Sequence, residues 1–220
     1  MSVLNNLKQL YREIPPNVKI VAVSKTMPIE IILEAYHAGH RLFGENKSQE
    51  IIAKHPFLPQ DIQWHFIGHL QSNKVKYLAP FIEMIESVDS LNLLMEINKQ
   101  AERHGRQIKC LLQFHIATEE TKFGLDIGEA ELLIMSREYA TMKNISLCGV
   151  MGMASFTEDE KLIRREFHGL KAVESHLKNR YFREKPEFCE ISMGMSGDYR
   201  IAIEEGSTII RIGTGIFGKV

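Results

Sequence analysis

A lysine directly follows a short apolar segment near the N-terminus, a position at which a charged ammonium group is unusual. Residues 18–24, VKIVAVS, read as a strand buried on both faces, and Lys25 and Thr26 follow at once. Lysine is among the residues least often fully buried unless it is paired or used. Lys25 could neutralise a bound anion, or its neutral amine could attack an aldehyde, because apolar walls disfavour the ammonium. It could also simply extend into solvent.

Two loops near the C-terminus are rich in glycine and hydroxyl groups. Residues 192–198 read SMGMSGD and lead into an expected helix, and residues 211–218 read RIGTGIFG. Free backbone N–H groups at a helix start attract phosphate, and glycine allows it to approach closely. Either loop alone is more often an ordinary turn, but together they favour a phosphate site. The residues concerned are Ser196, Gly197, Gly213, Thr214 and Gly215.

The elements that must position these residues form a repeating pattern. Eight apolar segments cover residues 18–24, 40–44, 62–67, 82–88, 108–116, 145–152, 187–193 and 208–213. Helical patterns lie at about 28–38, 46–54, 72–79, 90–104, 128–142, 158–180 and 198–205. A strand–helix repeat implies a parallel sheet, because each crossover needs a helix. We therefore predict the α/β class and a single (β/α)8 TIM barrel domain over residues 1–220, with an open doubly wound sheet as the alternative.

In such a barrel the active site lies where the strands end, and phosphate is commonly bound after strands seven and eight. The first strand, which ends at Lys25, then lies beside the eighth. Arg211 on that last strand points to the opposite face from Ile210 and Ile212. It could hydrogen-bond a ring nitrogen of a ligand, or equally pair with an acid inside the barrel.

Local patterns give further expectations. Ser90 and Gly105 are the expected cap and stop of one helix, and Thr157 with Glu160 has capping-box spacing at the start of another. The N-terminal segment predicts an amphipathic helix with one apolar side made of Val3, Leu4, Leu7 and Leu10. The three cysteines, Cys110, Cys148 and Cys189, read as buried thiols, and their spacing is too wide for a zinc site.

Composition excludes several classes of function. The 220 residues carry a net charge of -1, which gives no global electrostatic case for binding nucleic acid or an anionic membrane. No apolar stretch approaches the ~20 residues of a membrane span. The N-terminus lacks the pattern of a secretory signal, so we expect a cytoplasmic protein, and a monomer.

Six motifs, VAVSKT, FGEN, WHFIGHLQSNK, TKFG, SMGMSGD and RIGTGIFG, occur in the order found in the pyridoxal phosphate homeostasis proteins. The chain resembles that family from about residue 18 to 219. The resemblance implies a barrel like the N-terminal domain of alanine racemase, with pyridoxal 5′-phosphate (PLP) as cofactor. It also implies an internal aldimine on Lys25 and an Asn46 close to the cofactor. Lys47 and Ser48 stand where the family often has an aromatic residue and a valine.

For the remaining cofactor contacts, the resemblance implies that Ser196, Gly213 and Thr214 hold the phosphate and that Arg211 faces the pyridine nitrogen. An arginine there leaves that nitrogen unprotonated, which weakens the ring as an electron sink. We therefore expect a PLP carrier or regulator of the intracellular PLP pool rather than an enzyme.

Related racemases need a second acid–base group from an added β-domain and a partner subunit, and we expect no such domain here. His65 or His115 could act as a base, although a barrel histidine is more often structural. As a hypothesis, the exposed aldimine passes PLP to apo-enzymes through a second lysine, Lys74 or Lys122.

Three alternatives stay open. The first is a PLP-dependent amino-acid racemase with weak activity. The second is a phosphosugar aldolase or isomerase that uses Lys25 without PLP. The third is an interaction protein with a vestigial pocket.

Overall fold

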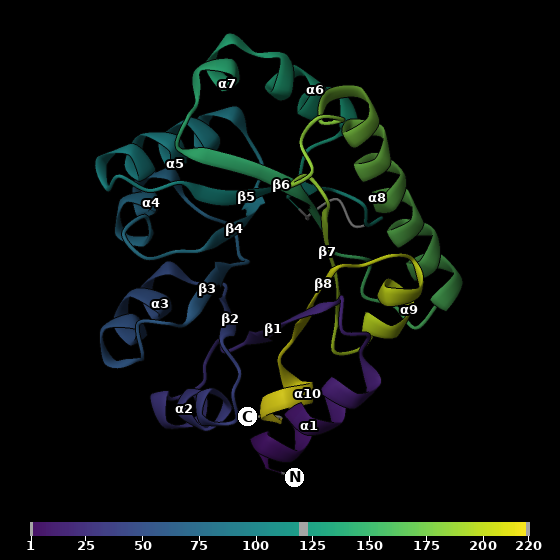
Figure 1. Ribbon diagram of the computed structural model, residues 1–220. Helices are drawn as coiled ribbons and strands as arrows, with labels where there is room; N and C mark the ends of the chain where they lie inside the picture. The colour runs from purple at the N-terminus through teal and green to yellow at the C-terminus, as the bar shows by residue number, and fades with distance from the viewer. Residues whose placement is uncertain (1, 119–122, 219–220) are drawn as a thin grey trace.

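Eight parallel strands close into a barrel in the computed structural model, which describes residues 2–118 and 123–218 (Figure 1). The strands are β1 (Lys19–Val23), β2 (Leu42–Glu45), β3 (Gln63–Phe66), β4 (Met84–Val88), β5 (Ile108–Phe114), β6 (Ile145–Gly152), β7 (Glu190–Met195) and β8 (Ile209–Ile212). They follow one another in sequence order, and β1 pairs with β8, with Val21 opposite Arg211. The predicted (β/α)8 barrel is confirmed, and the open-sheet alternative is wrong.

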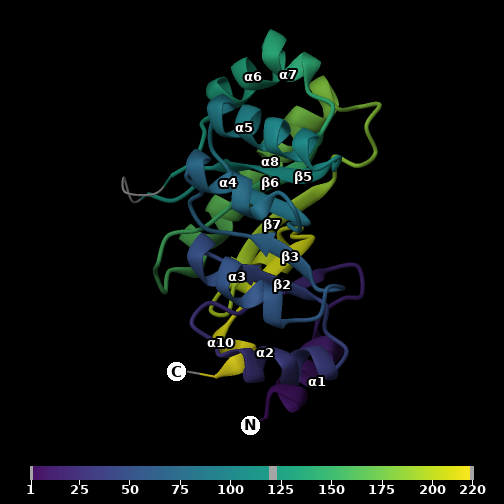
Figure 2. The ribbon, with the colours of Figure 1, turned by 90° about the vertical axis from the view of Figure 1, so that its left-hand side faces the viewer.

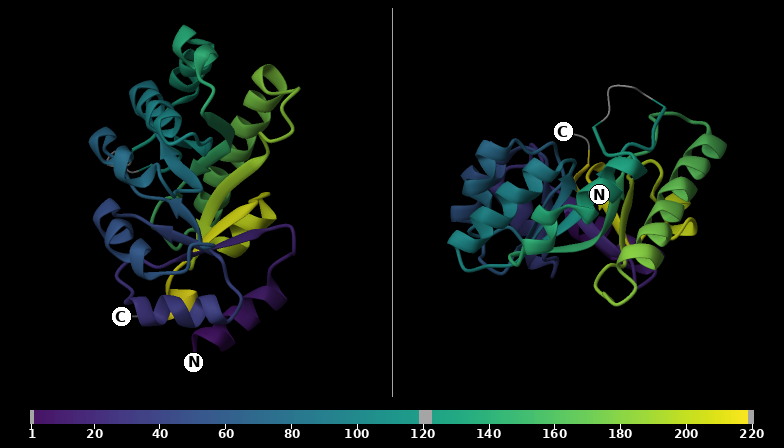
Figure 3. Two further views of the ribbon diagram at one scale, coloured as in Figure 1. Left: turned by 60° about the vertical axis from the view of Figure 1, so that its left-hand side comes forward. Right: turned by 90° about the horizontal axis from the view of Figure 1, so that it is seen from above.

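Helices surround the strands on the outside of the barrel. They are α1 (Val3–Glu13), α2 (Ile29–His37), α3 (Ser48–Lys54), the short 3-10 helix η1 (His55–Phe57), α4 (Ser72–Leu78), α5 (Leu91–Arg103), α6 (Ile127–Met135), α7 (Arg137–Thr141), α8 (Glu160–Tyr181), α9 (Tyr199–Glu204) and α10 (Thr214–Phe217). Figure 2 shows α2 to α5 in sequence order along one side, and Figure 3 shows the long α8 from two further directions. At the ends of the chain, α1 lies beside α10, where Asn6 Nδ2 donates a hydrogen bond of 2.8 Å to the carbonyl of Ile216.

The core has two layers because side chains alternate across each strand. A small cluster fills the barrel interior, and a much larger one fills the space between strands and helices. The interior cluster comprises Val21, Met84, Leu111, Cys148, Met151 and Ile209. Among the described helices, none is long and apolar enough to cross a membrane.

Two predicted helices differ from the structure in their boundaries. The segment expected over 128–142 is two helices, because Ser136 is extended (ψ 151°) and its hydroxyl caps α7 by accepting from Tyr139 N–H. The cap of α8 is Asp159, not Thr157: the Asp159 carboxylate accepts from Lys161 N–H at 3.0 Å. A carboxylate also complements the positive end of the helix dipole, which a hydroxyl does not.

Two burial predictions also need correction. Leu4 is 42% exposed because it is one residue, about 100°, further round α1 than Val3, whereas Leu7 and Leu10 lie on the buried side with Val3. Cys189 is exposed, since it precedes the first residue of β7 and so lies outside the strand, while Cys110 and Cys148 are buried as predicted. Across the described residues, no group of three or more His, Cys, Asp or Glu side chains could hold a metal ion.

Candidate functional site

A cavity of about 680 Å³ opens at the carboxyl ends of the strands. Its walls come from the ends of β1, β2, β3, β5, β6, β7 and β8 and the loops that follow them. All six residues predicted as a site line it: Lys25, Asn46, Ser196, Arg211, Gly213 and Thr214. The fold therefore brings together residues that are separated by up to 189 positions in the sequence (214 − 25).

Lys25 lies on the turn between β1 and α2, at the edge of the cavity. Ser24 before it is fully buried, whereas Lys25 itself is exposed. Thr26 after it has a φ of +64°, in the left-handed region that a β-branched residue rarely adopts. Because β1 pairs with β8, this turn lies beside the loop that begins at Gly213.

The two glycine-containing loops are adjacent, because they follow neighbouring strands. Ser196 follows β7, and its Oγ accepts a hydrogen bond of 3.3 Å from the N–H of Gly213, which follows β8. Thr214 and Gly215 are the first residues of α10, so their N–H groups have no acceptor within that helix. Hydroxyl and N–H donors thus converge on one wall, a donor set suited to an anion such as phosphate.

Asn46 supplies a polar atom without a partner. It follows β2 and lines the cavity, and its Oδ1 is buried with no hydrogen-bond partner among the described residues. Buried polar groups are nearly always paired in native proteins. The orphaned oxygen is the acceptor that a donor group on a bound molecule would satisfy.

Arg211 lies at the bottom of the cavity and is only 3% exposed. Its Nη1 donates to Ser192 Oγ at 2.5 Å and its Nη2 to the carbonyl of Gly152 at 2.9 Å. Nη1 also lies 3.8 Å from Glu86 Oε2. Burial lowers the pKa of Arg211, and the negative charge of Glu86 opposes that effect. The acid with which Arg211 could pair inside the barrel is therefore Glu86.

Glu86 is the acid that the sequence analysis did not identify. It is fully buried on β4, and its Oε1 lies 2.6 Å from His65 Nδ1, while Ser192 Oγ donates to Oε2 at 2.5 Å. Burial acts to raise the pKa of Glu86, but the hydrogen bond from His65 and the charge of Arg211 bring it below its ordinary value. The available signal was a glutamate flanked by Ile85 and Ser87 inside the expected strand 82–88, which also contains Glu83.

The other predicted groups lie away from the cavity. His65 is buried against Glu86, His115 is exposed just after β5, and Lys74 is half-buried on α4; none of the three lines the cavity. Lys122 lies outside the described residues.

His69 and Phe123 do line the cavity, although the sequence analysis gave them no role. Their rings stack with centroids 4.3 Å apart, and His69 Nδ1 lies 3.3 Å from Asp89 Oδ2. This stack extends the apolar wall of the cavity at the ends of β3 and β5. The sequence signal for it was the pair of motifs WHFIGHLQSNK and TKFG, which contain the two residues.

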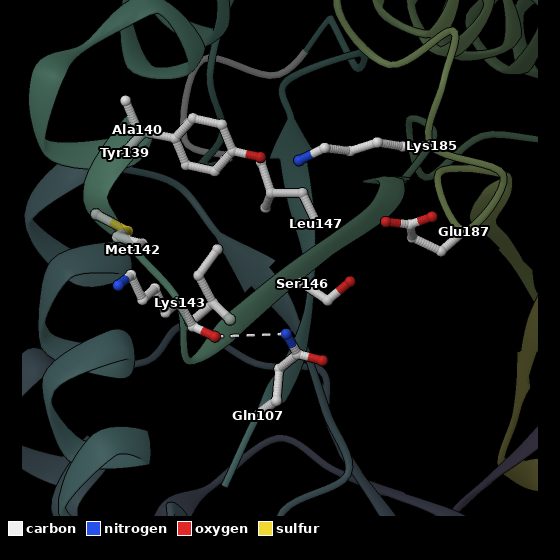
Figure 4. Close-up of a pocket in the computed structure, with 10 residues that line it drawn as sticks. Gln107, Tyr139, Ala140, Met142, Lys143, Ser146, Leu147, Lys185 and Glu187 are labelled. Atoms are coloured by element: carbon white, nitrogen blue, oxygen red, sulfur yellow. Dashed lines mark hydrogen bonds between the residues drawn. The ribbon is translucent and has the colours of Figure 1, made fainter.

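A second cavity, of about 370 Å³, lies at the opposite end of the barrel, among the residues that precede β5, β6 and β7 (Figure 4). Gln107, Lys143, Lys185 and Glu187 line it, and Gln107 Nε2 donates to the carbonyl of Lys143 at 3.4 Å. None of the predicted site residues lines this cavity. The cavity at the carboxyl ends is therefore the candidate site, as expected for this fold.

Comparison with known proteins defines the class. The family model described as "Alanine racemase, N-terminal domain" matches residues 2–220, so the fold belongs to that class of barrel. The chain belongs, more narrowly, to the pyridoxal phosphate homeostasis proteins. It is 39% identical over 203 residues to the pyridoxal phosphate homeostasis protein of Aquifex aeolicus, covering 91% of this chain and 86% of that protein. It is 37% identical over 211 residues to the human one, covering 91% and 76%.

Solved structures agree with this assignment. PipY of Synechococcus elongatus PCC7942 without PLP superposes with a TM-score of 0.92 at 33% identity, covering 99% of this chain and 100% of PipY. The structure of PipY with PLP bound superposes with a TM-score of 0.87 at 34% identity and the same coverage. PLP is thus bound by a member of the family that shares the whole barrel with this chain.

Proposed function

We propose that this chain binds PLP in the cavity at the carboxyl ends of the strands and takes part in the homeostasis of PLP. The observation that carries the proposal is that one cavity contains a lysine, an anion-binding pair of loops and a buried, unpaired acceptor on Asn46. PLP combines an aldehyde, a phosphate and ring substituents that can donate hydrogen bonds. The names of the relatives and the PLP-bound PipY structure support the same ligand.

In this proposal each group has a defined task. Lys25 Nζ adds to the aldehyde carbon, and loss of one water leaves a C=N bond, an internal aldimine; addition of water reverses the step. Ser196, Gly213 and Thr214 hold the phosphate. Arg211 faces the ring nitrogen as a hydrogen-bond donor, and its ion pair with Glu86 favours an arginine that keeps its proton.

We propose a carrier or regulator rather than an enzyme. Racemisation needs an acid–base group on each face of the substrate carbon. His65 does not line the cavity and is committed to Glu86, and His69 is stacked on Phe123 beside Asp89. A reversible bond at Lys25 at an open cavity suits the storage and release of PLP, with apo-enzymes as recipients.

The test is a spectroscopic titration with PLP. The wild-type protein is expected to develop the absorbance of a protonated Schiff base, and the variant Lys25→Ala is expected to show none. The same samples, mixed with L-alanine and analysed for D-alanine, separate the carrier from a weak racemase. Turnover that disappears in Lys25→Ala would refute the carrier, and a wild-type protein that develops no Schiff-base absorbance would favour a PLP-independent use of Lys25.

A further inference from the structure

A buried ion pair lies beneath the turn that carries Lys25. Glu45, the last residue of β2, is fully buried, and Lys54, the last residue of α3, places its Nζ 2.8 Å from Glu45 Oε1. The same ammonium lies 3.2 Å from Glu50 Oε2. None of these three side chains lines the cavity. The group therefore acts on the site only through the residues that it contacts.

The contacts of this charged group reach both residues adjacent to Lys25 in the chain. Lys54 Nζ donates to the carbonyl of Ser24 at 2.9 Å, and Ser24 Oγ donates to Glu45 Oε1 at 2.8 Å. The N–H of Thr26 donates to Glu50 Oε2 at 2.7 Å. The residue before Lys25 and the residue after it are thus both tied to a charge cluster of which Lys54 is the centre.

The turn needs such support. Thr26 has a φ of +64°, a conformation that persists in non-glycine residues only when the surroundings impose it. The hydrogen bond from Thr26 to Glu50 holds the backbone in that state, and Lys54 holds Glu50. Without the cluster, Thr26 would relax to a more favourable φ, and the direction of the Lys25 side chain would change with it.

The charge cluster around Lys54 is better suited to fixing the geometry of the turn than to stabilising the fold. Burial raises the pKa of Glu45, against the opposing effect of Lys54, and Glu45 Oε2 is buried with no partner among the described residues. Replacing a buried ion pair by apolar side chains is often neutral or stabilising. An ion pair with an unsatisfied oxygen, placed directly under the functional lysine, indicates a role in positioning.

We propose that Lys54 is a positioning residue for Lys25: it fixes the carbonyl of Ser24 and the left-handed Thr26 so that the Lys25 amine faces the aldehyde. This inference rests on the proposed function, because it concerns the bond that Lys25 forms with PLP. Lys54 touches none of the reacting atoms. It affects how fast the C–N bond forms, before water leaves, rather than how tightly the phosphate is held.

The experiment separates these two quantities. The rate of Schiff-base formation is followed by rapid mixing with PLP, and non-covalent affinity is measured with pyridoxine 5′-phosphate, which has no aldehyde. Lys54→Met is expected to slow Schiff-base formation at least about tenfold, since misplacing a reacting group by about 1 Å can cost a factor of about 100. Its affinity for pyridoxine 5′-phosphate should stay within about twofold of wild type, because the phosphate loops are untouched.

Two control variants test whether the effect on the rate is specific to the charge and position of Lys54. Lys54→Arg keeps the charge and should recover part of the rate. Lys47→Met removes an exposed lysine whose Nζ is 3.8 Å from Glu50 Oε1 but which is not bonded to the turn, and it should react at the wild-type rate. If Lys54→Met fails to fold, Glu50→Gln weakens the hold on Thr26 without emptying a buried position and is expected to slow the reaction in the same direction.

Folded Lys54→Met and Glu50→Gln variants that react at the wild-type rate would overturn the inference and leave the proposed function intact. A parallel loss of rate and of pyridoxine 5′-phosphate affinity would also overturn it, since that pattern indicates general damage. A wild-type protein that forms no Schiff base would instead refute the proposed function itself.

Discussion

The guanidinium of Arg211 and the carboxylate of Glu86 form an ion pair inside the barrel, with Nη1 3.8 Å from Oε2 and both side chains buried. Ser192 Oγ lies between them, since it accepts from Arg211 and donates to Glu86. The arginine at the bottom of the cavity is therefore oriented by the core of the barrel. A cofactor in the cavity would contact a guanidinium whose orientation is fixed before the cofactor binds.

Removing the negative charge of this pair should destabilise the fold. We expect Glu86→Gln to lower the free energy of unfolding by about 3–5 kcal/mol, because it leaves a buried arginine without its counter-charge. Urea denaturation measures the change. The matched control is Glu83→Gln, which removes a partially exposed pair with Lys109 and should cost less than about 1 kcal/mol. Equal effects of the two substitutions would contradict this account.

The same carboxylate predicts a dependence of stability on pH. The pKa of Glu86 is lowered in the folded protein, so its contribution is fully present above the unfolded value of about 4.3 and is lost as the pH falls through the folded pKa. Urea midpoints measured from neutral pH down to about pH 3 should therefore fall less steeply in Glu86→Gln than in wild type. Identical slopes would show that Glu86 does not titrate in this way.

Replacing Thr26 by glycine should stabilise the protein. Thr26→Gly removes the strain of a β-branched residue at a φ of +64° and should raise the free energy of unfolding by about 1 kcal/mol. Thr26→Ala, which keeps a Cβ, should not produce this gain, and thermal unfolding distinguishes the two. A destabilised Thr26→Gly protein would argue against strain at this residue.

Ser196 should discriminate between ligands with and without a phosphate. We expect Ser196→Ala to weaken PLP binding by roughly 10- to 100-fold, since a hydrogen bond to a charged group contributes about 1.5–3 kcal/mol. Affinity for pyridoxal, which has the aldehyde but no phosphate, should be unchanged. Equilibrium titration with both ligands measures the ratio, and equal losses for the two would place the phosphate elsewhere.

Much of the fold could be predicted because its signals are local. Each apolar segment of the barrel became a strand within a few residues, and Ser90 caps α5 as expected, with Leu93 N–H donating to its Oγ. The residues after the strand ends could likewise be chosen, because a closed parallel barrel brings all those ends to one rim. Lys25, Asn46 and Arg211 lie on one cavity for this reason.

The features that could not be predicted from the sequence depend mainly on contacts between residues far apart in the chain. Glu86 and Arg211 are 125 positions apart (211 − 86), and no local pattern indicates that they pair. The break at Ser136 also escaped prediction, because the apolar pattern continues through it while the backbone does not. The cluster beneath Lys25 is similar: Lys54 ends a helix, where a lysine is ordinary, and only the fold places it under the turn.

The most direct test of the central claim is to reduce the PLP-treated protein with borohydride and map the modified peptide by mass spectrometry. Borohydride fixes a C=N bond as a stable secondary amine on the lysine that formed it. We predict a single phosphopyridoxyl group on Lys25, and none in the pyridoxine 5′-phosphate control. Modification of a different lysine, with Lys25 unlabelled, would contradict the account.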